Sequence, residues 1–268
     1  MRDKARIARP LLLGFAFVAP LISLALIQTS IILALVPLFV SHLLLLYATL
    51  VANSQWWGAV LTTFDTRRDE VWLTIDDGPS PAHTIKVLDM LERFGARATF
   101  FVIGARAEKH PHLITEILAR GHTLANHTFS HTARTFWCAG PQRIAREIDR
   151  CAETLRSSPA RPNLFFRAPV GMTSPFLHPA LARRGMRLVG WTVRGLDTIQ
   201  RDVEKVAERI EKRVKPGAII LLHEGHQITR DPGFGPHCLE LTLQRLSQRG
   251  YHFVIPLPEQ LGTGRGGK

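Results

Sequence analysis

Two adjacent carboxylates, Asp76 and Asp77, hold the position in this chain most suited to chemistry. They follow the alternating apolar run 71–75 and come directly before Gly78 and Pro79. The alternation predicts a strand, and the Gly-Pro pair predicts a turn. Carboxylates at the carboxyl end of a strand lie where α/β folds usually place their catalytic groups. The same four residues also suit an ordinary solvated turn, so the interpretation needs support from elsewhere in the chain.

A pair of histidines, His127 and His131, gives that support. They are four residues apart and follow the predicted strand 123–126. On a helical turn, both imidazoles would project from one face and could share a metal ion. Two neutral imidazoles and one carboxylate form a divalent-metal site with open positions, as zinc hydrolases require.

Further polar groups recur wherever a predicted strand ends. In chain order these segments are Asp76-Asp77, His127–His131, Arg167–Gly171, Asp197 and Leu221–His223. The carboxyl ends of parallel strands meet at one edge of a sheet or at one mouth of a barrel. We therefore expect these five segments to lie together.

The elements that would position them alternate along about 190 residues. Strands are expected at 71–75, 99–103, 123–126, 164–167, 187–193, 218–222 and 252–255, from their short apolar runs. Amphipathic helices are expected between them, for example around Ile144, Ile148, Cys151 and Leu155. This alternation predicts a parallel sheet with crossover helices, open or closed, and seven strands favour a barrel.

The first fifth of the chain differs in kind. From Pro10 to Val51 there is no Lys, Arg, Asp or Glu. A spanning helix needs about 20 apolar residues, so this stretch suits two spans, near 11–27 and 31–50. A secretory signal would need a shorter apolar core and a small-residue cleavage site, and neither is evident.

Basic residues flank both sides of this segment, whereas the turn at 28–30 is uncharged. Arg2, Lys4, Arg6 and Arg9 precede it, and Arg67 and Arg68 follow it. The positive-inside rule then predicts two passes through a bacterial-type inner membrane, with the catalytic domain in the cytoplasm. If the segment crosses only once, the domain is periplasmic.

Charge and cysteine content narrow the classes of partner. The net charge is +12, but no nucleic-acid-binding module accompanies it, so we expect no nucleic acid partner and attribute the charge to contact with anionic lipid. Three cysteines, at spacings that fit neither a zinc knuckle nor a disulfide framework, favour a reducing compartment. Cys151 is expected in the core. Six histidines outside the motifs are expected in solvent: His83, His110, His112, His178, His226 and His237.

Composition divides the chain into five segments. A basic N-terminus is followed by two transmembrane helices, a linker, the α/β domain and a tail expected to be disordered, at 1–10, 11–52, 53–69, 70–256 and 257–268. There is no internal repeat.

The motifs between about Glu70 and Pro256, taken in their order along the chain, resemble those of the polysaccharide deacetylase family, the NodB-homology domains of carbohydrate esterase family four. Five motifs carry the resemblance: Thr74–Pro79, His127–His131, Arg167–Gly171, Trp191–Thr198 and Leu221–His223. The resemblance implies an α/β fold, a distorted (β/α)7 barrel of NodB-homology type, here preceded by an N-terminal transmembrane helical hairpin. It also implies hydrolysis of a carbon–nitrogen bond that removes an N-acetyl or other N-acyl group from an amino sugar.

The resemblance assigns the groups that bind metal and activate water. Asp77, His127 and His131 correspond to the metal ligands, and Asp76 to the general base. Arg167 corresponds to the residue that orients that base. The implied cofactor is a divalent metal ion, zinc first, with cobalt, nickel or manganese as alternatives.

The remaining roles concern the oxyanion and the leaving amine. Val170 corresponds to the residue whose backbone N–H faces the oxyanion. His223 corresponds to the general acid, and Asp197 to the aspartate behind it.

Three positions depart from the family pattern. Val170 and Thr198 replace aromatic residues, and Arg194 replaces an acidic residue. These positions surround the substrate pocket, so the substrate stays open among a polysaccharide, an oligosaccharide and a lipid-linked saccharide. The sequence does not name the sugar, the acyl group or the oligomeric state.

Three alternative functions are compatible with the same predicted barrel. One is a catalytically silent barrel that binds a saccharide, although intact acids and histidines argue against decay. Another is a deformylase of a lipid-linked amino sugar, which would release formate. A third is a hydrolase of a non-sugar imide.

Overall fold

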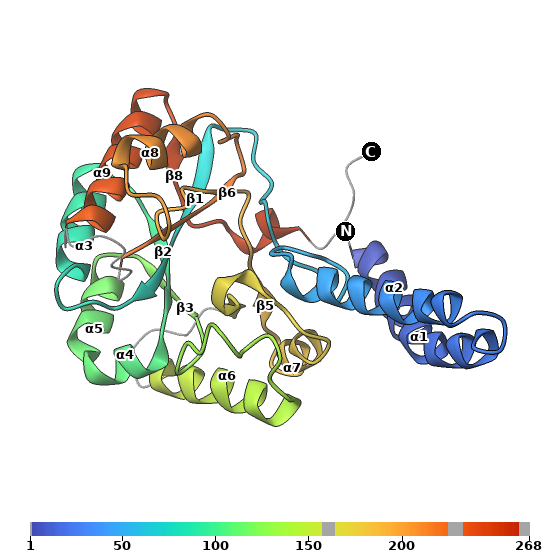
Figure 1. Ribbon diagram of the computed structural model, residues 1–268. Helices are drawn as coiled ribbons and strands as arrows, with labels where there is room; N and C mark the ends of the chain where they lie inside the picture. The colour runs from blue at the N-terminus through green and yellow to red at the C-terminus, as the bar shows by residue number, and fades with distance from the viewer. Residues whose placement is uncertain (1, 157–163, 225–232, 263–268) are drawn as a thin grey trace.

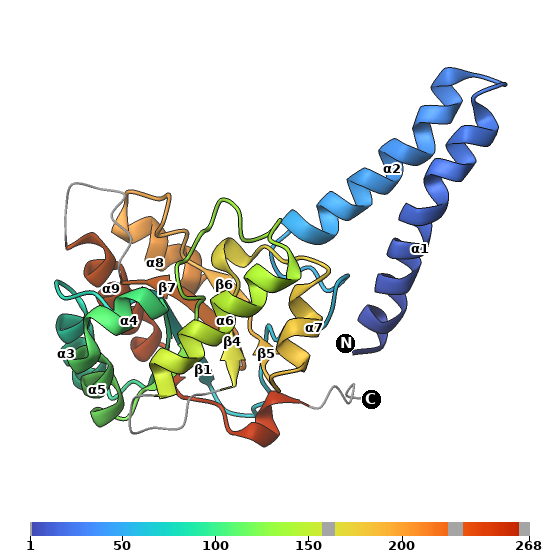
Figure 2. The ribbon, with the colours of Figure 1, turned by 90° about the horizontal axis from the view of Figure 1, so that it is seen from below.

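The protein is described by a computed structural model covering residues 2–156, 164–224 and 233–262. A helical hairpin projects from an α/β barrel (Figure 1). The hairpin consists of α1 (Arg2–Leu26), which includes the expected basic N-terminus, and α2 (Ile31–Leu50). The two helices pack side by side, and their connecting turn lies farthest from the barrel (Figure 2).

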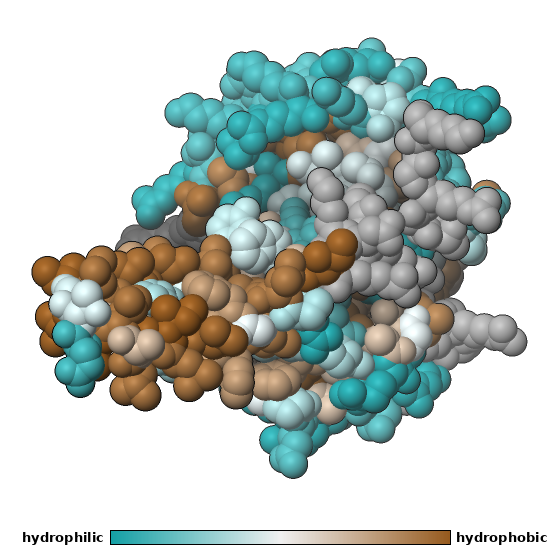
Figure 3. Space-filling view, turned by 90° about the vertical axis from the view of Figure 1, so that its right-hand side faces the viewer, coloured by the Kyte–Doolittle hydropathy of each residue, from teal (hydrophilic) through white to brown (hydrophobic). Residues whose placement is uncertain are grey.

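The surface of the hairpin is apolar and largely exposed. Hydrophobic side chains cover it, whereas the barrel surface in the same view is mainly hydrophilic (Figure 3). Within α1 and α2, the windows Ile7–Leu26 and Ile31–Leu50 are long and apolar enough to cross a membrane, and only 17% of each is buried. A helix of 20 residues is about 30 Å long, which matches the hydrocarbon core of a bilayer.

The barrel is built on a curled parallel sheet. Its strands are β1 (Glu70–Gly78), β2 (Ala98–Val102), β3 (Thr123–Asn126), β4 (Phe165–Phe166), β5 (Arg187–Leu188), β6 (Val193–Arg194), β7 (Ile219–His223) and β8 (His252–Phe253). They are ordered β5-β4-β3-β2-β1-β7-β6, all pairings are parallel, and β8 pairs with the start of β1. The expected α/β fold is confirmed, with β5 and β6 at the two ends of the curled sheet.

Helices pack around this sheet. They are α3 (Thr84–Arg93), α4 (Gly104–Lys109), α5 (Pro111–Ala119), α6 (Pro141–Arg156), α7 (Leu177–Ala182), α8 (Val203–Glu211) and α9 (Phe234–Gln248), with short 3-10 turns η1 (Pro169–Gly171) and η2 (Pro258–Leu261). The apolar stripes recognised in the sequence face inward. On α6, Ile144, Ile148, Cys151 and Leu155 are all buried, which confirms Cys151 as a core residue.

One expected strand is wrong. The run 187–193 forms two separate strands, β5 and β6, at opposite ends of the sheet. Between them the Gly190 N–H donates to the carbonyl of Leu61, which comes from the segment expected to be a linker. A side chain at residue 190 would collide with Asn53, because a Cβ there would lie 2.0 Å from Asn53 Oδ1.

Two segments expected outside the domain pack into it. The segment 53–69 buries Trp57, Val60 and Phe64, and it bridges to Val189 and Ala218 of the sheet region. Burial of these apolar side chains holds the segment against the domain, so it is not a free linker. At the other end, η2 buries Leu261, so the expected disordered tail is ordered as far as residue 262, and residues 263–268 lie outside the described part of the chain.

Candidate active site

A β-bulge brings the two adjacent carboxylates to the same side. In a regular strand, neighbouring residues point to opposite faces of the sheet. The register between β1 and β2 shifts between Asp76 and Gly78, and Asp77 has a positive φ of 68°. Bulges of this kind re-aim side chains next to active sites. Both carboxylates consequently reach His127, at 3.7 Å from Asp76 Oδ2 and 3.5 Å from Asp77 Oδ1.

The two motif histidines meet through a loop and not through a helical turn. Thr128 and His131 both have positive φ, at 66° and 49°. Glu147 on α6 accepts hydrogen bonds from the backbone N–H groups of Phe129 and Ser130. These bonds give the two loop N–H groups the partners that a helix or strand would otherwise supply. The four-residue spacing therefore brings the imidazoles together by a mechanism that differs from the expected helix.

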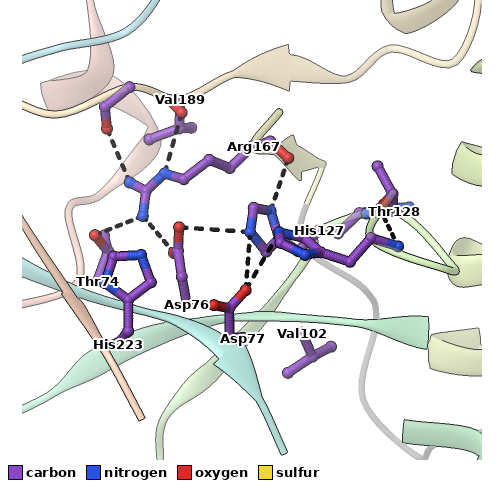
Figure 4. A network of polar contacts seen from close by, with 12 residues as sticks. Thr74, Asp76, Asp77, Val102, His127, Thr128, Arg167, Val189 and His223 are labelled. Carbon is purple, nitrogen blue, oxygen red and sulfur yellow. Dashed lines mark hydrogen bonds and ion pairs between the residues drawn. The ribbon is translucent and has the colours of Figure 1, made fainter. Parts of the chain in front are cut away.

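The three expected metal ligands form a small triangle. Figure 4 shows Asp77 and His127 turned towards each other. Asp77 Oδ1 lies 3.5 Å from His127 Nε2 and 3.3 Å from His131 Nε2, and the donor atoms of all three residues lie within 4.8 Å of one another. Donors of a tetrahedral zinc site, each about 2.1 Å from the ion, lie about 3.4 Å apart. The triangle therefore fits a divalent cation.

The hydrogen bonding of His127 supports the same fit. Its Nδ1 lies 2.9 Å from the carbonyl oxygen of Arg167, which can only accept, so Nδ1 carries the proton. In the neutral ring, Nε2 then turns a lone pair towards the carboxylates of Asp76 and Asp77. A cation between these groups would relieve that repulsion, and a carbonyl behind the ring is the usual support of a metal-binding histidine. Burial lowers the pKa of His131 to about 4, so the His131 ring is neutral near pH 7.

Arg167 is fully buried and holds Asp76 in place. Its Nη1 donates to Asp76 Oδ1 at 2.6 Å and to Thr74 Oγ1 at 2.8 Å. Its other nitrogens donate to the carbonyls of Val189 and Gly190, and its guanidinium lies over the ring of Phe101, 4.1 Å from the centroid. These contacts occupy one oxygen of Asp76 and leave the other facing His127 (Figure 4).

Asp197 and His223 form a second acid–histidine pair. His223 Nδ1 lies 3.1 Å from Asp197 Oδ1, and the His223 backbone N–H donates to Asp197 Oδ2 at 2.7 Å. Burial lowers the pKa of His223, but the charge of Asp197, its hydrogen bond and the more distant Asp77 and Asp76 outweigh burial and raise that pKa to about 9. The imidazole is therefore protonated near pH 7.

Val170 lies in the η1 turn, three residues after Arg167. Its φ of 52° is positive, and its side chain is half exposed. The next residue, Gly171, also has a positive φ, and a Cβ there would lie 2.4 Å from the ring of Trp191 and 3.0 Å from Ala52. The positive φ values of Val170 and Gly171 thus set a tight turn directly after β4, with the Val170 side chain half exposed.

Sequence reasoning missed Glu224, which directly follows His223. Glu224 is buried against Gly78, and its two carboxyl oxygens accept from Thr84 Oγ1 at 3.1 and 3.2 Å. Burial raises the pKa of Glu224 to about 8. Its backbone N–H donates to the carbonyl of Asp76, so Glu224 ties the carboxyl ends of β1 and β7 together. A polar residue immediately after a motif histidine was the available signal.

The expectation for the other histidines is partly wrong. His83 is buried and His178 is half-buried, because the starts of α3 and α7 fold onto the domain. Burial lowers the pKa of His178 to about 4. His112 and His237 are exposed and His110 is partly exposed, whereas His226 lies outside the described residues. Within the described residues, the metal-ligand triangle is the one detected group of this kind.

Comparison with known proteins identifies relatives of this chain. Residues 64–189 match the family model described as polysaccharide deacetylase. A chitooligosaccharide deacetylase of Bradyrhizobium sp. (strain ANU 289) is 33% identical over 193 residues, which cover 72% of this chain and 85% of the relative. A peptidoglycan-N-acetylglucosamine deacetylase of Bacillus cereus is 31% identical over 184 residues, which cover 68% and 84%.

Solved structures agree with these matches. The Bc1960 peptidoglycan N-acetylglucosamine deacetylase superimposes with a TM-score of 0.65 at 28% identity, covering 74% of this chain and 91% of that one. A family 4 carbohydrate esterase from Streptomyces lividans, solved in complex with acetate, gives a TM-score of 0.63 at 27% identity, covering 71% and 94%. In both cases the match covers about three quarters of this chain.

Proposed function

Since this chain belongs to the polysaccharide deacetylase family and is a hydrolase of carbon–nitrogen bonds, we propose that it is a membrane-anchored, metal-dependent enzyme that de-N-acylates an amino sugar. The observation that carries the proposal is the triangle of Asp77, His127 and His131 beside Asp76. The acyl group is acetyl, in line with relatives named as deacetylases of chitooligosaccharides and of peptidoglycan N-acetylglucosamine. The substrate is an N-acylated amino sugar of a polysaccharide, an oligosaccharide or a lipid-linked saccharide.

The proposed cofactor is a divalent ion, zinc first, held by Asp77, His127 and His131. When bound, such an ion supplies Lewis acidity, which lowers the pKa of water and polarises the amide carbonyl. The chain itself holds these ligands in place. The carbonyl of Arg167 orients the His127 ring, and the bulge at Asp77 turns its carboxylate towards both imidazoles.

Asp76 is the proposed general base. Its Oδ1 is bound by Arg167, so its Oδ2, on the side of the histidines, is the oxygen that can accept the proton of the attacking water. Arg167 is a positioning residue in this scheme, because it contacts Asp76 and not the substrate. The remaining contacts of Arg167, to Thr74 and to two carbonyls, keep the carboxylate aimed.

His223 is the proposed general acid, and Val170 supplies an oxyanion donor. As water adds to the acyl carbon, the Val170 N–H donates to the developing oxyanion; in characterised enzymes such a donor contributes about 3 kcal/mol. The carbon–nitrogen bond then breaks, and the protonated imidazole of His223 gives its proton to the leaving amine. Asp197 stabilises the imidazolium. The products are acetate and a free amine.

Membrane anchoring rests on the exposed apolar hairpin. Its two windows are mostly unburied, unlike the core helices of a soluble domain, and a single secretory signal would not include a second apolar helix of 20 residues. Basic residues on both flanks support the barrel in the cytoplasm, at a bacterial-type inner membrane. A reporter fused after Lys268 that is active only in the periplasm would contradict this orientation.

The activity is tested with the full chain purified in detergent and supplied with zinc or cobalt. We expect acetate release from N-acetylglucosamine oligomers, and loss of that release in Asp76→Asn and in Asp77→Ala. The exposed Asp89→Asn is the matched control, because Asp89 only pairs with Arg120 at the surface. Wild-type turnover in Asp77→Ala would refute the metal-dependent mechanism, and formate in place of acetate would identify a deformylase.

A further inference from the structure

The base of the hairpin is built into the rim of the proposed active site. The Thr173 N–H donates to the carbonyl of Thr49 at 3.0 Å, and Arg9 donates to the carbonyl of Pro175 at 3.2 Å. Thr173 and Pro175 follow β4, on the loop that begins with Val170. The anchor therefore contacts the carboxyl ends of the strands, where the site opens.

A second contact joins the anchor to the same rim. Asn53, three residues after the end of α2, donates through its side chain to the carbonyl of Trp191 at 2.9 Å. Trp191 lies just after β5, and its ring packs against Gly171. Two loops of the mouth are thus attached to the last turn of the hairpin and to the residues directly after it.

These contacts set the height of the site above a bilayer. The second apolar window ends at Leu50, so Thr49 and its partner Thr173 lie at the edge of the hydrocarbon. Val170 is three residues from Thr173, which limits their separation to about 11 Å. The headgroup layer on each side of a bilayer is about 5–8 Å thick. The oxyanion donor therefore lies within or just above the headgroups.

The rim between bilayer and site carries apolar and aromatic side chains. Val170 is 50% exposed and Phe176 is 46% exposed, and both belong to the loop that contacts the anchor. Tyr47 and Trp56 pack against each other at the hairpin base, with ring centroids 5.1 Å apart. Aromatic residues are typical of membrane interfaces. Such a rim suits contact with lipid.

A cation lies at the same rim. Arg194 ends β6, is exposed, and lies over the Trp191 ring, 5.6 Å from the centroid. The edge of the same ring lies against the Gly171 turn. An exposed guanidinium fixed on an aromatic ring is well suited to bind phosphate. It replaces the acidic residue that the family pattern places here.

We propose that the substrate is an N-acylated amino sugar joined through a phosphate to a membrane lipid, and that Arg194 binds this phosphate. The proposal rests on the proposed de-N-acylation and names its substrate class. A sugar on a lipid phosphate projects from the headgroups at the height of Val170. Hydrolysis of its amide leaves the bond between sugar and phosphate intact.

The position of the mouth is tested without reference to activity. In a Cys138→Ser background, Phe176→Cys and Gln248→Cys are labelled with an environment-sensitive fluorophore, and the full chain is placed in phosphatidylcholine vesicles containing lipids with a headgroup quencher. Gln248 is exposed at the opposite end of the barrel, next to the start of β8. We expect at least threefold stronger quenching at residue 176 than at residue 248. Equal quenching would overturn the placement of the mouth, whether or not the protein is an active hydrolase.

The substrate class is tested with three N-acetylglucosamine compounds: a polyprenyl-phosphate-linked form in vesicles, the soluble 1-phosphate and the neutral trimer. We expect kcat/KM at least tenfold higher for the lipid-linked form than for either soluble compound. In Arg194→Gln the preference for phosphate-bearing compounds over the trimer should fall at least tenfold, whereas Arg213→Gln, exposed at the far end of α8, should retain it. Activity only on the trimer would overturn the proposal and leave the proposed hydrolase standing. Inactivity on all three compounds would overturn both.

Discussion

Arg167 and Asp76 form a buried ion pair, with Arg167 Nη1 2.6 Å from Asp76 Oδ1, at the centre of the candidate active site. Both side chains are at most 3% exposed, so water cannot replace either partner. Removing one member of such a pair costs about 3–5 kcal/mol, because the other charge stays buried. The pair therefore links the stability of the barrel to the orientation of Asp76, the proposed general base.

The first prediction concerns this pair. We expect Arg167→Met to lower the melting temperature and to reduce acetate release more than 100-fold. Arg167→Lys keeps the charge, but a single ammonium group cannot reach Asp76, Thr74 and Gly190 in the geometry of a guanidinium. It should retain most of the stability and still lose more than tenfold in kcat. Differential scanning fluorimetry and acetate assays measure both effects, and a fully active lysine variant would contradict the positioning role.

The second prediction concerns pH. The pKa of His223 is raised to about 9, so its imidazole is protonated below that pH and loses its proton above it. A general acid must be protonated, and kcat should therefore fall as the pH rises through about 9. Asp197→Asn removes the charge and the hydrogen bond that raise the pKa, so the alkaline limb should move to lower pH. A pH–rate profile with no such movement would exclude His223 as the acid.

The third prediction concerns metal content. The wild-type chain should bind one zinc ion. At a free zinc concentration 100 times the dissociation constant, this binding should stabilise the fold by about 2.7 kcal/mol. Asp77→Ala and His131→Ala should lose both the stoichiometric ion and the thermal shift. His112→Ala serves as the control, because His112 is exposed on α5. Titration calorimetry with unchanged stoichiometry in Asp77→Ala would remove Asp77 from the ligand set.

The fourth prediction concerns the turn beneath Val170. Gly171 has a φ of 73°, and a Cβ there would lie 2.4 Å from Trp191. Left-handed backbone costs an L-residue about 1–2 kcal/mol, so Gly171→Ala should lower the melting temperature by about 2–8 °C and reduce kcat. Gly140→Ala is the control, since nothing lies within 4 Å of a Cβ at that position. Equal melting temperatures for the two variants would disprove the packing argument.

The fifth prediction concerns the thiols. Burial raises the pKa of Cys151 and of Cys238 to about 12, whereas Cys138 is exposed. Iodoacetamide should therefore modify the native chain once, at Cys138, and three times after denaturation. Mass spectrometry of the alkylated protein gives the count. A second rapid modification in the native state would mean that one of the two buried thiols opens to solvent.

The parts of the fold that follow from short-range patterns were predictable from the sequence. The runs 71–75, 99–103 and 123–126 are continuous or alternating apolar segments, and each lies within or overlaps a central strand. The motif residues at their ends meet, because parallel strands place all carboxyl ends at one mouth. Ordinary strand and helix periodicity was sufficient for this much.

The parts that depend on distant partners were not predictable in this way. The break between β5 and β6 requires Leu61 and Asn53, which come from more than 120 residues earlier. The bulge at Asp77 depends on the register with β2, and the turn at His131 depends on support from Glu147. Glu224 follows the motif residue His223 directly, but its burial against Gly78 and Thr84 becomes evident only in the folded chain. In each case a tertiary contact overrides the local pattern.

The bridge between Leu61 and Val189 determines where the chain can be truncated. Leu61 pairs with Val189 after β5, and Thr63 pairs with Ala218 before β7, so the segment after α2 takes the place of a strand between the two ends of the curled sheet. A fragment that starts at Glu70 would lack this segment, and with it the buried side chains of Trp57, Val60 and Phe64. The smallest catalytic fragment that keeps these contacts therefore starts before Trp57, within a few residues of the end of α2 at Leu50.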